Sequence, residues 1–334
     1  MKNLKRRQKL YRLMLSAKNS LAALLVLAVV SVPALAGTDP AKEDSPLGSF
    51  IAKKVGPGED IFHITARRLF GTQKTPANLK PDAIGTYARG CMAGAQALPV
   101  TGPTWQAMRL SRNRNWALPQ TISLIEKLAN YAKIEFGWNG LLVGDMAQPR
   151  GGPMLSGHAS HQIGLDADVW FTPMPNRVLT TAERETFVPL EMVKNHYEMN
   201  PDNWSVERAK LLKTAASYPE VARIFVHPPI KAALCSWAAN DADKSWLAKI
   251  RPMPNHTFHF HIRLNCPAGM KNCKNQWKPN PADGTGCGKE LAYWMGGKAW
   301  QKPKPNPNAK PYVPPPPLTL SGLPAECRAV VKAP

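Results

Sequence analysis

Six cysteines constrain the fold of this chain more than any other feature, because all of them follow a segment typical of protein export. An even number of cysteines in an exported chain indicates disulfide bonds rather than free thiols. The sequence contains no Cys-x-x-Cys pair, which leaves a thioredoxin-like redox site or a zinc ribbon without support. Many pairings are compatible with the spacing. The six residues are Cys91, Cys235, Cys266, Cys273, Cys287 and Cys327.

Residues 1–36 have the pattern of a signal peptide. A basic stretch without acidic residues precedes an apolar run over residues 21–32 and the small residues of Ala34-Leu35-Ala36. The apolar run is shorter than the ~20 residues that span a bilayer, which argues against the alternative of an uncleaved anchor. We predict an exported chain that begins near Gly37, has no stable membrane insertion after cleavage, and acts in the periplasm.

The remaining sequence divides by composition into three parts. Residues 37–51 are small and polar and predict a mobile arm. Residues 52–300 alternate apolar runs with Pro and Gly, as in a loop-rich globular domain. Residues 301–334 begin with a proline-rich stretch typical of polyproline II, for which a ligand of an aromatic groove is the alternative. Cys327 offers a way to tie this tail back to the body.

The charge of the chain restricts its partners. The net charge is +20, and after the first 36 residues, which hold seven basic residues, 36 basic residues face 23 acidic ones, or +13. A basic exported protein is attracted to anionic cell-wall polymers, lipopolysaccharide or phospholipid headgroups, the alternative being a solvated surface with no dedicated partner. Export argues against nucleic acid.

The periodicity of apolar residues mixes helices and strands. It predicts helices over residues 118–137 and 204–218, the first of them ending at Gly137. Strands are predicted over residues 140–146, 166–171, 222–226 and 259–264. The elements do not alternate regularly, so we expect an α+β fold rather than a doubly wound sheet.

Histidines and aspartates gather on two of these strands. In a strand over residues 259–264, His259 and His261 lie on one face, and Phe258, Phe260 and Ile262 lie on the other. In the strand over residues 166–171, Asp168 shares a face with Asp166 and Trp170, and His161 precedes it in a glycine-flanked loop.

These residue types suit a catalytic zinc site. Three protein ligands and one water are typical of such sites, and His161, Asp168 and one of the two strand histidines would supply the three. The other strand histidine could transfer a proton. The alternatives are hydrogen-bonded polar groups without a metal, or a purely structural site.

Three segments resemble one enzyme family: "GGPMLSGHASHQIGLDADVWF", "ARIFVHPPIKAALC" and "RPMPNHTFHFHIRLNCP". Together they are similar to the penicillin-insensitive murein endopeptidases, from about Gly85 to Trp294. This family belongs to metallopeptidases that share a fold with D-Ala-D-Ala carboxypeptidases and the Hedgehog amino-terminal domain. The resemblance implies a small antiparallel sheet with flanking helices, long loops and disulfide staples.

The resemblance also assigns roles to residues. It implies His161, Asp168 and His261 as zinc ligands and His259 as the catalytic base. His158 resembles a family histidine linked to a second, non-catalytic metal, and His256 a residue on the rim of the active site.

Two further implications concern the second metal and the cysteines. The family pairs the second metal with an Asp and a His three residues apart, but here Val193 precedes His196. Val193 at the position of the Asp argues against a second zinc, and the sequence leaves open whether one binds. The cysteine positions of the family imply the bridges Cys91–Cys327, Cys235–Cys287 and Cys266–Cys273.

The implied activity is zinc-dependent hydrolysis of peptide cross-links in peptidoglycan, at the D-alanyl–meso-diaminopimelate bond. The sequence lacks the Ser-x-x-Lys motif of penicillin-reactive enzymes, so we expect insensitivity to β-lactams. The alternatives are a D,D- or L,D-carboxypeptidase of the same fold, or an inactive zinc-containing module that binds the cell wall. The sequence leaves the oligomeric state open, a homodimer included.

Overall fold

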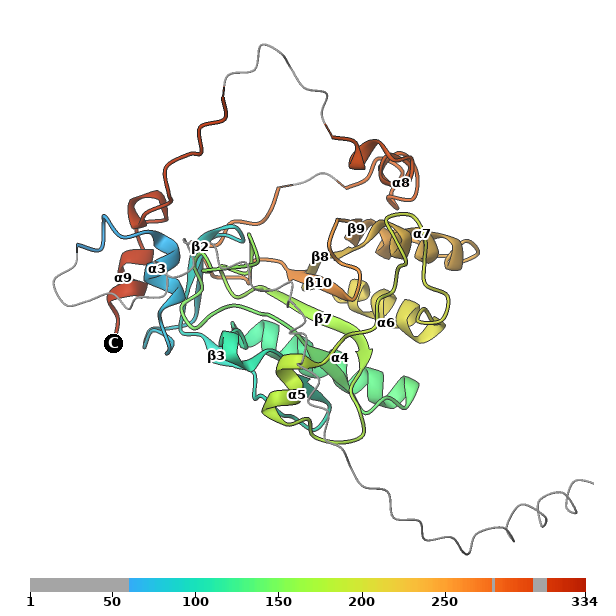
Figure 1. Cartoon of the computed structure of the whole chain (residues 1–334), viewed down its shortest axis with the longest axis horizontal. Coiled ribbons are helices and arrows are strands. Elements are labelled where there is room, and N and C mark those ends of the chain that lie inside the picture. The colour runs from blue at the N-terminus through green and yellow to red at the C-terminus, as the bar shows by residue number, and fades with distance from the viewer. Residues whose placement is uncertain (1–59, 278–279, 303–310) are drawn as a thin grey trace, which may run out of the picture. The chain divides into compact units, whose positions relative to one another are not determined.

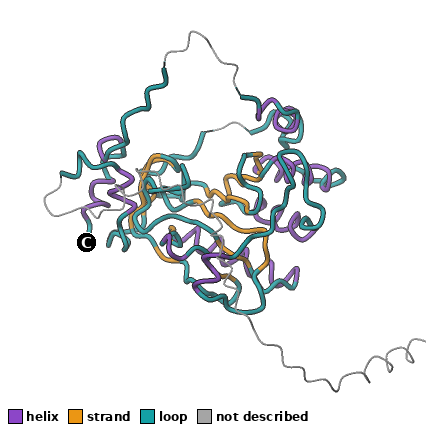
Figure 2. Tube along the Cα trace, viewed as in Figure 1, coloured by secondary structure: helices purple, strands orange, loops and turns teal. Residues whose placement is uncertain are grey.

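A computed structural model describes residues 60–277, 280–302 and 311–334 (Figure 1). The predicted signal peptide and N-terminal arm lie outside these residues. Within the described residues, no helix has the length and apolarity needed to cross a membrane. Long loops join the elements (Figure 2).

The two longest helices of the described residues, α4 and α6, are those predicted from the sequence. The α-helices are α3 (Ala66–Gly71), α4 (Pro119–Phe136), α5 (Thr181–Thr186), α6 (Val206–Ser217), α7 (Pro228–Trp237), α8 (Lys289–Met295) and α9 (Cys327–Lys332). The 3₁₀ helices are η1 (Leu110–Arg112), η2 (Ser245–Lys249), η3 (Lys298–Trp300) and η4 (Leu320–Gly322).

The strands form one main sheet and two pairs. The pairs are β1 (Asp82–Thr86) with β2 (Arg89–Ala93), and β3 (Gln96–Ala97) with β5 (Trp116–Ala117). The main sheet has the order β4-β6-β7-β10-β8-β9. Its strands are β4 (Trp105–Ala107), β6 (Leu141–Val143), β7 (Asp166–Pro173), β8 (Val221–Val226), β9 (Ile250–Pro252) and β10 (His259–Leu264).

The main sheet is mixed rather than purely antiparallel. β7 pairs antiparallel with β6 and β10, and β10 pairs antiparallel with β8. The edge pairs β4–β6 and β8–β9 are parallel, which corrects the expected antiparallel sheet. The reason is the connections: α4 lies between β4 and β6 and α7 between β8 and β9, and a parallel pair needs such a crossover. The α+β class is confirmed, and the relation to the Hedgehog fold stays a prediction.

Helix α4 confirms the apolar stripe read from the sequence. Its residues Leu124, Ile125 and Leu128 are fully buried and belong to the main core with the apolar face of the sheet. The helix ends at Gly137, whose φ of 67° and N–H bond to the Lys133 carbonyl form a left-handed C-cap. Of the predicted strands, β10 has the expected bounds, β7 is longer, and β6 keeps only three residues.

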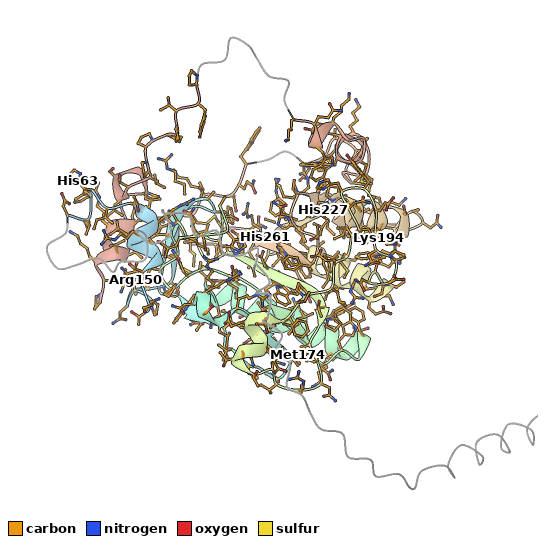
Figure 3. All side chains as sticks on the ribbon, in the orientation of Figure 1. His63, Arg150, Met174, Lys194, His227 and His261 are labelled. Atoms are coloured by element: carbon orange, nitrogen blue, oxygen red, sulfur yellow. A yellow bond between two sulfur atoms is a disulfide. The ribbon has the colours of Figure 1, made fainter. Side chains whose placement is uncertain are left out.

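A second, smaller core joins the first described helix to the C-terminal segment. It contains Phe70 of α3, Cys91 of β2 and Val330 of α9, and the Cys91–Cys327 disulfide crosses it. The Arg150 guanidinium donates to the carbonyls of Val330, Val331 and Ala333, which satisfies the open end of α9 (Figure 3). The other two predicted bridges, Cys235–Cys287 and Cys266–Cys273, are also confirmed.

Candidate metal centre and active site

The register of β7 and β10 brings the predicted site residues together. His261 pairs with Asp168 across the two strands, and Arg263 pairs with Asp166. Because side chains alternate along a strand, these four groups share one face of the sheet. The interior position of His261 can be followed in Figure 3.

Three ligand atoms converge on this face. His161 Nε2 lies 3.1 Å from His261 Nδ1 and 3.5 Å from Asp168 Oδ1, and His261 Nδ1 lies 3.2 Å from that same oxygen. In a tetrahedral zinc site with bonds of about 2.0–2.2 Å, the ligand atoms are roughly 3.3–3.6 Å apart. The triangle therefore has nearly the size that one metal ion requires.

Hydrogen bonds alone leave this triangle unsatisfied. An imidazole–imidazole bond would use one nitrogen of His161 and one of His261. Asp168 Oδ1 is buried and has no hydrogen bond of acceptable geometry to any described residue. A cation in the triangle would be coordinated by all three atoms, and imidazole with carboxylate is a donor set that suits zinc. The residues thus fit a metal ion.

Asp166 lies behind the triangle and orients it. Its carboxylate accepts bonds from His261 Nε2 at 2.9 Å, from Arg263 Nε at 2.7 Å and from the His161 backbone N–H at 3.0 Å. When His261 donates through Nε2, its Nδ1 lone pair is left facing His161 and Asp168. Such a carboxylate behind a histidine is typical of metal sites.

The loop that carries His161 is fixed by the β1–β2 hairpin. His161 itself has a φ of 64°, a left-handed conformation that non-glycine residues seldom adopt. The next residue, Gln162, bonds to the hairpin through its amide, which donates to the Ala88 carbonyl and accepts from Gly90 N–H. Gly164 has a φ of 72°, and a Cβ there would meet Met92 Sδ at 2.1 Å. The strained loop is therefore held in one conformation.

The protonation of His161 and Asp168 suits metal binding, whereas a metal would have to displace a proton from His261. Burial lowers the pKa of His161 to about 4, so the imidazole is neutral at pH 7. Burial acts to raise the pKa of Asp168, but the charges of His259 and His161 hold it well below its usual range. Burial also opposes protonation of His261, yet the charge and hydrogen bond of Asp166 raise its pKa above the ordinary value. Asp168 is thus an anionic group between imidazoles.

His259 and His256 lie beside the triangle. His259 Nε2 is 3.7 Å from Asp168 Oδ2, the oxygen that faces away from the triangle, and burial lowers the pKa of His259. The His256 ring is 5.1 Å from that of His259 and 6.0 Å from that of His261. Burial lowers the pKa of His256 to about 3, and its Nδ1 lies 2.7 Å from the Pro254 carbonyl oxygen.

His158 lies on the other side of Asp168. Its Nε2 is 3.6 Å from Asp168 Oδ2 and 3.0 Å from Asp145 Oδ2. His158, His161 and Asp168 also have ligand atoms that lie within 4.8 Å of one another, so a second set of three residues could hold a metal. The set with His261 is tighter, because its three atoms are all within 3.5 Å.

Sequence reasoning missed Asp145 and two arginines. Asp145 Oδ2 accepts from Arg114 Nη1 at 2.8 Å and from Arg112 Nη1 at 3.1 Å, in addition to its contact with His158. Burial acts to raise the pKa of Asp145, but the hydrogen bond from His158 and the charges of both arginines lower it. The available signal was an acidic residue inside the strand predicted over residues 140–146, in "GLLVGDM".

The remaining candidates lie apart from the triangle. The His196 ring stacks on Trp300 with centroids 3.9 Å apart, and Val193 is buried in the main core. Among the described residues, no convergent set of three His, Cys, Asp or Glu residues includes His196.

Phe258 does not fill the main core beside Phe260 as expected. The strand starts only at His259, and Phe258 packs against Trp170 in a separate cluster.

Comparison with known proteins finds one family over most of the chain. The family model described as penicillin-insensitive murein endopeptidase matches residues 83–332. A relative of that name in Haemophilus influenzae is 43% identical over 238 residues, which cover 71% of this chain and 80% of the relative. Relatives of the same name are 38% identical over 257 residues in Klebsiella pneumoniae subsp. pneumoniae (77% and 88% covered) and 39% over 250 residues in Salmonella newport (75% and 85%).

Proposed function

The chain belongs to the penicillin-insensitive murein endopeptidase family, and from this membership we propose that it hydrolyses peptide cross-links of peptidoglycan with the help of a zinc ion. The observation that supports the metal is the triangle of His161 Nε2, His261 Nδ1 and Asp168 Oδ1, with edges of 3.1–3.5 Å. The proposed bond is D-alanyl–meso-diaminopimelate. The proposed location is the periplasm, where the basic chain would meet an anionic wall polymer.

His161, Asp168 and His261 would hold the zinc ion. A bound zinc ion would polarise the scissile carbonyl and lower the pKa of water. Asp166 would keep His261 in the tautomer whose Nδ1 faces the triangle. The strained backbone at His161 would fix the third ligand before substrate arrives.

His259 is proposed as the group that moves protons. Burial lowers its pKa, so its imidazole is neutral at pH 7 and can accept a proton from the attacking water. It could then pass that proton to the nitrogen of the leaving amine. His256, 5.1 Å away between ring centroids, would line the rim of the site. His158 would bind Asp145 and Asp168 beside the metal.

The test is digestion of a purified cross-linked muropeptide dimer, followed by chromatography. We expect two monomers as products, loss of activity with a chelator, and its return on addition of zinc. A tagged penicillin should label nothing, because the chain has no Ser-x-x-Lys motif. Release of free D-alanine from monomers instead of cleavage of dimers would replace the proposal with a carboxypeptidase. Binding to the wall polymer without any cleavage would replace it with a non-catalytic module.

A further inference from the structure

A short loop beside the site is held in a strained conformation. Helix η1 lies between Arg109 and Asn113, whose φ angles of 56° and 51° are left-handed. The Arg109 guanidinium donates to carbonyls at the end of α5, those of Arg184, Glu185 and Phe187. Ser111 bonds to the Glu185 carboxylate through its N–H and its hydroxyl. Strain of this kind persists only where the surrounding structure enforces it, and it is concentrated at functional sites.

The two arginines that follow differ in how their donors are used. The Arg114 side chain is 9% exposed and binds Asp145 through Nη1 and Ser156 through Nη2. The Arg112 side chain is 49% exposed and donates through Nη1 to Asp145 Oδ2. Within the described part of the chain, Nε and Nη2 of Arg112 have no protein acceptor. Arg114 is therefore structural, whereas Arg112 presents unused donors to solvent.

Short contacts connect Arg112 to the metal triangle. Asp168 Oδ2 is 3.6 Å from His158 Nε2, which is 3.0 Å from Asp145 Oδ2, and that oxygen is 3.1 Å from Arg112 Nη1. A peptide whose reacting carbonyl lay at the triangle would thus have a neighbouring residue within reach of the guanidinium.

The local charge favours an anion at this position. Three arginines of the loop, Arg109, Arg112 and Arg114, face two carboxylates, Asp145 and Glu185. Asp145 accepts hydrogen bonds from both Arg112 and Arg114, so its single carboxylate offsets only one of the two arginines that it binds. The excess positive charge lies at the half-exposed guanidinium. A guanidinium binds a carboxylate through two parallel hydrogen bonds, which gives both strength and orientation.

We propose that Arg112 is a specificity-determining residue, which binds a free carboxylate of the substrate next to the scissile bond. The inference rests on the proposed function. In the proposed cross-link, the carbon that carries the scissile nitrogen also carries a carboxylate of diaminopimelate. This group lies on the leaving side of the reacting carbonyl, and its recognition by Arg112 would distinguish a cross-link from a neutral peptide.

The test compares two synthetic cross-linked dimers, one with this carboxylate free and one with it converted to an amide. The wild type should cleave the acid with a kcat/KM about 10–100 times higher than the amide, the value expected for charge-assisted hydrogen bonds. Arg112→Ala should reduce this ratio to about 1 by losing activity on the acid alone. Arg112→Lys should keep part of the preference, because it retains the charge but not the two-pronged geometry.

Two controls make the result specific. Arg177→Ala removes an arginine of similar exposure, 57%, which pairs with Glu183, and it should keep the wild-type ratio. A dimer amidated at a remote carboxylate should be cleaved like the acid. An equal loss on both substrates in Arg112→Ala would show that Arg112 acts through Asp145 and would overturn the inference. Equal cleavage of acid and amide by the wild type would overturn it and leave the proposed function intact. A wild type that cleaves neither would overturn both.

Discussion

The two faces of β7 and β10 are made of alternate residues in the same strands, and they have opposite chemistry. One face consists of apolar side chains in the main core, namely Ala167, Val169, Phe171, Phe260 and Ile262. The other carries the polar and charged groups Asp166, Asp168, His259, His261 and Arg263, together with Trp170 opposite His259. Both faces are buried, so the difference between them is not one of solvent contact.

The comparison shows how a polar site can be kept in one geometry. Burial of apolar area favours folding, whereas burial of charges is unfavourable unless they are paired. On this sheet the same backbone serves both purposes, because residues of the polar face and of the apolar face alternate along β7 and β10. The apolar face therefore stabilises the strands on which the polar face depends. Substitutions on neighbouring residues should separate the two contributions.

The largest effect is expected for His261→Ala. The substitution removes one of three proposed ligands and leaves Asp166 with Arg263 and the His161 backbone N–H as its partners. Bound zinc and hydrolysis of cross-linked muropeptides should both fall to background. Metal analysis by mass spectrometry and a chromatographic activity assay measure the two quantities. A variant that keeps one zinc ion per chain would place the metal at the alternative set with His158.

His259→Ala should affect the rate without removing the metal. His259 lies on the same strand face but contacts Asp168 through the oxygen outside the triangle. We expect about one zinc ion per chain and a loss of roughly 10²–10⁴ in kcat, the usual contribution of a positioned acid–base group. If His259→Ala loses its zinc while His261→Ala keeps it, the two roles are reversed.

Phe260→Ala should lower the stability of the fold and leave the metal site intact, whereas His259→Ala and His261→Ala should affect the site. The side chain is fully buried and packs against Phe171 with ring centroids 5.4 Å apart. Its removal should lower the free energy of unfolding by about 3–5 kcal/mol, whereas Ile262→Val should cost only about 0.5–1.5 kcal/mol. Urea unfolding gives these values. The folded fraction of Phe260→Ala should still bind zinc, and loss of metal from that fraction would mean that the two faces are not separable.

Lys231, a buried basic residue outside the site, tests the free-energy cost of burying a charge separately from the proposed metal centre. Lys231 of α7 is fully buried and donates to the carbonyls of Leu247 and Thr285, and burial lowers its pKa to about 7. Between pH 7 and about 10, the unfolded chain binds more protons than the folded one at this residue, so stability should rise with pH. The slope is at most about 1.4 kcal/mol per pH unit.

Lys231→Met should remove this slope, as urea unfolding at pH 7 and pH 9 would show. The variant lacks the titrating group but keeps a side chain of similar length. A slope that is unchanged in Lys231→Met would assign it to another residue, and the cost of burying this ammonium would then be small.

The sequence predicted the parts of the site that depend on strand alternation. His259 and His261 share a face as expected, and Asp168 lies opposite His261. Alternation does not reveal what covers a face. Arg263, for example, is covered by the ring of Tyr87, 4.2 Å from its guanidinium carbon, and by Gln276. These contacts join residues far apart in the chain, so the burial of the polar face could not be predicted.

The positions of Asp145 and Arg112 at the site also could not be predicted, because both depend on how the elements pack together. Asp145 reaches the site because β6 pairs with β7, where its backbone carbonyl accepts a bond from Asp168 N–H. Arg112 reaches it through η1, a turn with no periodic signal. The choice of His261 over His259 as a ligand came from the family resemblance, since alternation treats the two alike. The parallel edges of the sheet depend on how α4 and α7 cross it.

The Cys91–Cys327 bridge joins residues 236 positions apart, and this has a consequence for biosynthesis. Ribosomes make proteins from the N-terminus, so Cys91 remains without its partner until a further 236 residues have been added. A nascent chain, or one shortened before Cys327, carries a lone thiol and lacks α9, which packs against β2. Such a product is open to thiol-directed quality control and to proteases. Closure of this bridge thus marks a polypeptide that has been made at least as far as Cys327.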